Sequence, residues 1–121
     1  MRFSKDHCRI DKTENGVRIG ITDYAVGKIC KSFEIFLCDE DDYIHAGESL
    51  GEIISCEFFD IISPVNGTAV RINEEVLANP KLLVSGNPWL VEMIDVAYTQ
   101  PLMSESEYND YVNNLNYLLQ K

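Results

Sequence analysis

The sequence predicts a mainly β protein that ends in one amphipathic helix, and three observations support this fold class. Apolar and polar residues alternate through residues 17–21, as expected for a strand with one buried face. Two apolar segments, residues 50–54 and 58–62, flank a short polar break, which is typical of a β-hairpin. Near the C-terminus, apolar residues instead recur at helical spacing.

Length and charge limit the classes of protein to which the chain can belong. Its 121 residues fit one domain, with a β-rich body over residues 1–99 and a helix over residues 103–120. The formal net charge of −10 argues against nucleic acids and anionic membranes as partners, because both repel an acidic surface. No segment approaches the roughly 18 continuous apolar residues of a membrane helix, and no secretory signal precedes the first strand. We therefore expect a cytoplasmic monomer with protein partners.

The four cysteines, at positions 8, 30, 38 and 56, show no Cys-x-x-Cys spacing. Only two histidines accompany them, so the sequence predicts neither a metal site nor a redox motif. In a cytoplasmic protein we expect all four thiols to be reduced and no structural disulfide to form. Cys30 is expected to be a small residue of the core.

The first elements follow from turn signals and alternation. Residues 1–12 predict an entry strand, and an Asn-Gly pair predicts a tight turn before the strand at 17–21. Thr22 or Asp23 can accept hydrogen bonds from backbone N–H groups and so cap a short helix. We expect this helix to run to about Lys31.

A second alternating segment, residues 32–37, predicts another strand, and the acidic run at 38–42 follows it. Adjacent carboxylates raise the possibility of a calcium site. However, the run lacks the ligand spacing and the glycine of an EF-hand loop, so a solvated acidic turn is favoured.

The central hairpin has its polar break at residues 55–57, with Cys56 near the tip. The Ser-Pro-Val-Asn-Gly segment at 63–67 then ends the second strand. Pro64 removes a donor from the strand ladder, and the Asn-Gly pair favours a tight turn.

Further elements complete the sheet after the hairpin. Residues 68–72 predict a strand with Val70 and Ile72 facing inward. Asn73 is expected to be the N-cap of a short helix, because its side chain can accept from the first free N–H groups. Residues 90–95 predict the last strand.

The C-terminal helix begins with a capping box. Ser104 can accept from an early backbone N–H group, and Glu107 can reach back to another. We expect the helix to dock on the sheet, with binding to a partner protein as the alternative. Its apolar face comprises Tyr108, Tyr111, Val112, Leu115, Leu118 and Leu119.

Four segments together resemble the H protein of the glycine cleavage system, a lipoyl-domain family. They are Gly-Ile-Thr-Asp-Tyr-Ala at 20–25, the hairpin and turns at 47–67, the segment 73–83, and Trp89-Leu90. The resemblance covers nearly the whole chain. It implies a flattened antiparallel β-sandwich of the lipoyl-domain type (a barrel-sandwich hybrid), with short helices, a C-terminal helix, and Trp89 packed in the core.

In that family the hairpin tip carries a lipoylated lysine four residues before an aspartate. Counting back from Asp60 gives Cys56, and no lysine occurs between Lys31 and Lys81. The resemblance therefore implies that Cys56 occupies the position of the carrier lysine and that no lipoyl cofactor is attached. The candidate site comprises Cys56, its flanks Ser55, Glu57, Phe58, Phe59 and Asp60, and the turn residues Ser63, Pro64 and Gly67.

Phe58 and Phe59 are neighbours on the second strand of the hairpin, so their side chains point to opposite faces. One is expected in the core. The other is expected to be exposed near the tip, where an aromatic side chain suits contact with a protein.

No catalytic motif occurs in the sequence, and the resembled family is a non-catalytic carrier, so we expect no enzyme. The favoured hypothesis is an adaptor that docks on glycine cleavage or lipoylation proteins. The alternative is a cysteine-based carrier that holds persulfide, acyl or disulfide-linked cargo on Cys56. Other hypotheses are use of free lipoate, a structural relic, or a Cys56 that is merely a tolerated surface residue.

Overall fold

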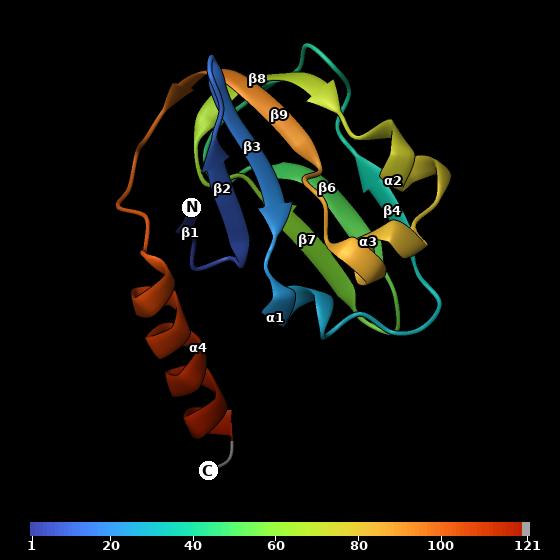
Figure 1. Cartoon of the computed structure of the whole chain (residues 1–121), viewed down its shortest axis with the longest axis vertical. Helices are drawn as coiled ribbons and strands as arrows, with labels where there is room; N and C mark the ends of the chain where they lie inside the picture. Colours follow the sequence, from blue (N-terminus) through green and yellow to red (C-terminus); the bar gives the residue numbers. More distant parts are fainter. Residues whose placement is uncertain (120–121) are drawn as a thin grey trace.

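The computed structural model describes residues 1–119, with side chains described as far as Leu115. Within this range, two antiparallel sheets form the body of the protein (Figure 1). The larger sheet has the order β1 (Arg2–Phe3), β2 (Cys8–Lys12), β3 (Gly16–Ile21), β9 (Val91–Ala97), β8 (Asn66–Ile72) and β5 (Tyr43–Ile44). The smaller sheet has the order β4 (Glu34–Leu37), β6 (Ser49–Ile54) and β7 (Phe58–Ile62). The mainly β fold class is therefore confirmed.

The core lies between the two sheets. Alternation in β3 places Val17, Ile19 and Ile21 inward, and the two-residue period of a strand explains this pattern. The smaller sheet contributes its own inward-facing residues, and the largest fully buried side chains include Leu50, Ile53, Ile61, Val65, Leu83, Leu90 and Met93. Apolar burial on this scale is the main stabilising contribution to the fold.

The predicted entry strand is divided into two. A turn between β1 and β2 contains His7, whose backbone has a φ of 68°. The acidic run after β4 forms a turn, in which the Asp42 side chain accepts from the Asp39 backbone N–H at 3.1 Å. Among the described residues, no group of three or more His, Cys, Asp or Glu side chains is arranged to hold a metal ion.

The first helix, α1 (Asp23–Val26), is shorter than predicted. Thr22 is its N-cap, and its hydroxyl accepts from the Ala25 backbone N–H at 3.2 Å. The helix ends at Val26, with Gly27 as its C-cap, rather than near Lys31. Glycine weakens a helix interior, and the chain then continues as a loop toward β4.

Two expectations for the segment after the hairpin are confirmed only in part: Ile72 is buried and Asn73 is the N-cap residue of the next helix, but Val70 and the Asn73 side chain differ from the prediction. In β8, the register against β9 shifts between Ala69 and Arg71, so Ala69 is fully buried and Val70 is only half-buried. Asn73 precedes α2 (Glu74–Ala78), but its side chain donates to the Trp89 backbone carbonyl at 2.7 Å and does not cap the helix.

Trp89 lies half-buried at the surface, beyond α3 (Lys81–Gly86), and not in the core as the resemblance implied. The guanidinium carbons of Arg18 and Arg71 lie 4.7 Å and 5.7 Å from the centre of its ring. Cation–π contact with the two guanidinium groups stabilises the indole ring at the surface, where the charged groups remain accessible to water.

The C-terminal helix α4 (Glu105–Leu119) projects away from the sheets (Figure 1). Its capping box is confirmed: Ser104 accepts from the Glu107 N–H at 3.2 Å, and Glu107 accepts from the Ser104 N–H at 3.0 Å. The helix docks through its first turns, where Tyr108 is buried and stacks on Phe3 at 4.9 Å. The predicted apolar positions Leu118 and Leu119 lie outside the residues whose side chains the structure describes. No helix in the described part of the chain has the length and apolar composition needed to cross a membrane.

Candidate functional site

The hairpin tip is a three-residue loop at one end of the smaller sheet. Ile54 of β6 pairs with Phe58 of β7, so Ser55, Cys56 and Glu57 form the connection. The Ser55 N–H donates to the Glu57 carbonyl at 3.2 Å and closes the loop. Cys56 is exposed at its apex, as the sequence predicted.

The two adjacent phenylalanines divide between the two faces, as the alternation of a strand requires. Phe59 lies half-buried against the core, opposite Ile53. Phe58 faces outward and is 61% exposed. With Ile54 (44% exposed) and Phe36 of β4 (48% exposed), it forms an exposed apolar patch on the outer face of the smaller sheet. We call these three side chains the outer apolar patch.

Carboxylates accompany the outer apolar patch. Strand register places Glu34 in the same row as Ile54 and Phe58, and places Glu52 and Asp60 in the same row as Phe36. The patch is therefore apolar at its centre with acidic side chains beside it, a pattern that suits a partner with a complementary basic rim.

Asp60 serves the base of the hairpin and not its tip. Its carboxylate accepts from the Ser49 hydroxyl at 2.6 Å, next to a register shift between Ser49 and Gly51. Although Asp60 belongs to the predicted flank of the site, the structure places it two residue pairs away from Phe58. Its hydrogen bond indicates a role in holding the hairpin.

Of the predicted turn residues, Ser63 and Pro64 lie in the connection at the opposite end of β7 from Cys56, whereas Asn66 and Gly67 begin β8, so the prediction of a tight Asn-Gly turn is wrong. Ser63 is buried and donates to the Val65 carbonyl at 2.7 Å, while its own carbonyl accepts from the Gly47 N–H at 2.9 Å. Pro64 is buried beside it. A Cβ at Gly67 would come within 3.0 Å of the Ile94 carbonyl oxygen, so a larger residue would crowd β9. These residues support the sheet and are not part of the tip.

The structure joins Cys56 to Cys30 in a disulfide, with a Cα–Cα distance of 5.8 Å. The expectation of four reduced thiols without a disulfide is therefore wrong, and so is the assignment of Cys30 to the core. Cys30 lies half-buried in the loop after α1. Because α1 ends early, this loop can extend across to the hairpin tip.

A second contact joins the same two loops. The Cys30 N–H donates to the Ser55 hydroxyl oxygen at 2.7 Å, and the Ser55 hydroxyl lies 3.8 Å from the Cys56 sulfur. Ser55 therefore links the backbone of one cysteine to the sulfur of the other. The alignment of the Cys30 loop with the tip does not depend on the disulfide alone.

A cavity of about 260 Å³ opens beside the tip, between α1 and the hairpin. Lys28 and Tyr24 come from the α1 side, and the Lys28 ammonium lies 5.1 Å from the centre of the Tyr24 ring. From the hairpin side come Ser55, Glu57 and Phe58. The α1 side of this site could not be predicted from the sequence, because nothing in the local pattern relates residues 24–30 to the tip.

The other two cysteines are free and poorly suited to exchange chemistry. Burial raises the pKa of the Cys8 thiol to about 12, with a further increase from Asp6. Burial and the nearby Asp42 raise the pKa of the Cys38 thiol to about 11. Because the thiolate is the nucleophile, both residues are expected to react slowly.

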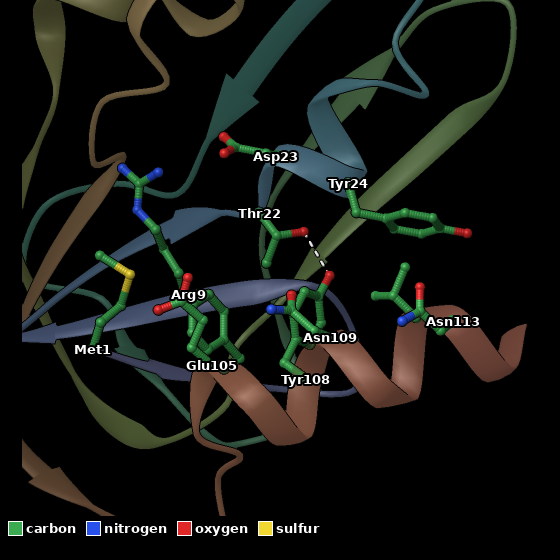
Figure 2. Close-up of a pocket in the computed structure, with 11 residues that line it drawn as sticks. Met1, Arg9, Thr22, Asp23, Tyr24, Glu105, Tyr108, Asn109 and Asn113 are labelled. Carbon is green, nitrogen blue, oxygen red and sulfur yellow. Dashed lines mark hydrogen bonds between the residues drawn. The ribbon is translucent and has the colours of Figure 1, made fainter. Parts of the chain in front are cut away.

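A larger cleft, of about 480 Å³, lies between α4 and the body (Figure 2). At its base, the hydroxyls of Tyr108 and Thr22 lie 2.7 Å apart, and His7 Nδ1 lies 2.8 Å from the same tyrosine oxygen. Burial lowers the pKa of His7 and raises that of Tyr108. These hydrogen bonds attach the helix to the body, and they give the polar side chains at this end of the cleft their partners.

Comparison with known proteins agrees with this architecture. A family model described as glycine cleavage H-protein matches residues 1–115. The glycine cleavage system H protein of Streptomyces avermitilis is 31% identical over 116 residues, covering 92% of this chain and 93% of that protein. The H protein of Tropheryma whipplei is 33% identical over 110 residues, covering 90% of this chain and 91% of that protein.

A solved structure shows the same fold. The crystal structure of a glycine cleavage system H protein from Mycobacterium marinum matches with a TM-score of 0.84 at 27% identity, covering 93% of this chain and 95% of that chain. The chain therefore belongs to the glycine cleavage H-protein family.

Proposed function

We propose that this protein is a non-lipoylated member of its family that docks on glycine cleavage or lipoylation proteins as an adaptor. The observation that carries the proposal is the residue at the hairpin tip. The resemblance to the family implies a lipoyl-lysine at this position. This chain instead has Cys56, whose sulfur is bonded to that of Cys30. A lipoyl amide requires a primary amine, and the chain has no lysine between Lys31 and Lys81.

The proposed docking surface is the outer apolar patch. Aromatic side chains surrounded by polar groups are frequent contributors to binding energy at protein interfaces. Phe58, the most exposed of the patch residues, lies two positions from Cys56, so a partner that approaches the tip would contact both. No catalytic step is assigned to the protein itself.

The alternative, a carrier with cargo on Cys56, requires one additional condition. The Cys56 sulfur must first be released from Cys30, because a disulfide sulfur holds neither a persulfide nor an acyl group as a free thiol would. The exposure of Cys56 favours this alternative, and its bond to Cys30 opposes it in the oxidised state.

Binding to purified glycine cleavage and lipoylation proteins from the same organism tests the docking proposal. Phe58→Ser should weaken binding by about tenfold or more, as expected for an interface aromatic. Tyr43→Ser is the matched control, because Tyr43 is a similarly exposed aromatic (54%) on β5 of the other sheet. Equal affinities for both variants and the wild type, or no binding to any of these proteins, would contradict the proposal.

A further inference from the structure

We propose that Cys30 and Cys56 form an intrinsic dithiol–disulfide couple that exchanges two electrons with a dithiol partner. This inference goes beyond the docking function and does not depend on it. It rests on three features of the pair: unequal exposure of the two residues, their position in loops, and the Ser55 hydroxyl near both of them.

The unequal exposure defines which sulfur is attacked. Cys56 is exposed at the apex of the hairpin, whereas Cys30 is half-buried in the facing loop. Thiol–disulfide exchange depends on access to the attacked sulfur. An incoming thiolate therefore reaches the Cys56 sulfur first, and Cys30 is the leaving thiol.

The position in loops allows the bond to open without loss of the sheets. Cys30 lies between α1 and β4, and Cys56 lies between β6 and β7. Neither cysteine is paired with a residue of another strand in the smaller sheet or in the larger sheet. Breaking the disulfide therefore leaves the antiparallel ladders intact.

Ser55 keeps the two cysteines together in the reduced state. Its oxygen accepts from the Cys30 N–H at 2.7 Å, a hydrogen bond that does not require the disulfide. Its hydroxyl lies 3.8 Å from the Cys56 sulfur, where it can donate to a thiolate. Two thiols held at this spacing re-form their bond in an intramolecular step, which favours reversibility.

The exchange balances as follows for the reductive direction. A thiolate of the partner dithiol attacks the Cys56 sulfur, the Cys30–Cys56 bond breaks, and Cys30 leaves as a thiolate that takes up a proton. The second partner thiolate then attacks the partner's own sulfur in the mixed disulfide and releases Cys56 as a thiolate, which is protonated in turn. The partner dithiol loses two electrons and two protons, and the Cys30/Cys56 pair gains them. The oxidative direction is the reverse.

Alkylation followed by mass spectrometry measures this couple on the folded chain. The oxidised protein is incubated separately with dihydrolipoamide and with a thioredoxin-type protein dithiol, and free thiols are then alkylated under native conditions. We expect at least one dithiol to expose Cys30 and Cys56 together, while Cys8 and Cys38 remain unmodified. Faster reaction with dihydrolipoamide would assign a small dithiol group as the partner, and faster reaction with the protein would assign a protein dithiol.

Single variants test the direction of attack. Each variant is mixed with the disulfide form of the partner, which tests the oxidative direction. In Cys30→Ser, the Cys56 thiolate attacks the partner disulfide, one partner sulfur leaves as a thiolate that takes up a proton, and the mixed disulfide persists because Cys30 is absent to resolve it. Cys56→Ser should form the corresponding mixed disulfide on Cys30 about tenfold more slowly, because Cys30 is less exposed. Cys38→Ser is the control and should leave the exchange unchanged. Equal trapping rates in the two variants, or reduction of the wild type only when the protein is unfolded, would overturn the proposal.

The two proposals can fail independently. Phe58→Ser should lose partner binding and keep exchange with dihydrolipoamide. Wild-type protein that binds its partners but is reduced by neither dithiol would overturn the exchange proposal alone.

Discussion

The Cys30–Cys56 cross-link should make a large contribution to the stability of this chain, and its removal is a quantitative test. The two residues are separated by 26 positions. Closing a loop of this length in the unfolded chain reduces its conformational entropy, which corresponds to about 3.5 kcal/mol of folded-state stability at 25 °C. Reduction of the disulfide, or the Cys30→Ser/Cys56→Ser substitution, should therefore lower the free energy of unfolding by about this amount.

Urea denaturation at neutral pH, with and without a phosphine reductant, measures the effect. With an m-value of about 2 kcal/mol/M, the midpoint of the oxidised wild type should fall by about 1.7 M on reduction. The double serine variant should unfold near the reduced midpoint and should not respond to the reductant, which makes it the matched control. A wild-type midpoint that does not change on reduction would refute the assignment of the cross-link.

Three further predictions concern the fold around the site. Gly51→Ala should destabilise the protein by about 1–3 kcal/mol, because a Cβ there would clash with the β4 backbone, whereas Gly86→Ala, with open space around it, should be nearly neutral in the same thermal denaturation experiment. Tyr108→Phe removes hydrogen bonds to Thr22 (2.7 Å) and His7 (2.8 Å), so the free energy of unfolding should fall by about 1–2 kcal/mol, and an unchanged melting temperature would contradict this account of helix docking. Burial lowers the pKa of His7 below its ordinary value of 6.5, so below that pH the unfolded chain binds more protons than the folded one. The free energy of unfolding should therefore decrease as the pH falls from about 6.5, and His7→Gln should reduce that dependence in urea titrations.

The hairpin could be predicted from sequence because its signals are local. Alternating apolar residues and the polar break at 55–57 define β6, β7 and the tip within a few residues. The capping box at Ser104 and Glu107 is equally local, since both partners lie within one turn. Patterns of this range do not need tertiary information.

The disulfide could not be predicted because it depends on tertiary placement. Cys30 comes near Cys56 only because α1 ends at Val26 and the following loop extends toward the tip. Only half of the signal was present in the sequence, namely the position of Cys56 at the hairpin tip. Cys56 lies at the hairpin tip and Cys30 in a loop, whereas Cys8 begins β2 and Cys38 directly follows β4. This distinction becomes visible only after the end of α1 is known.

Trp89 and Val70 show two other limits. Trp89 is apolar enough for the core, but its ring lies against two arginines at the surface, from the strands on either side of β9. Val70 fits a strict two-residue alternation, yet a register shift beside Ala69 turns it away from full burial. In both cases, neighbours distant in sequence decide the outcome.

The most direct test of the central claim is the intact mass of the protein isolated from its own host, with thiols left unalkylated and no reductant added. The account predicts a mass with no added group. Reduced protein should have the mass of the bare polypeptide, and protein with the disulfide should be lighter by two hydrogens, which peptide mapping should assign to Cys30 and Cys56. A lipoyl group on any residue would contradict the claim that the hairpin tip has exchanged a lipoyl arm for a cysteine pair.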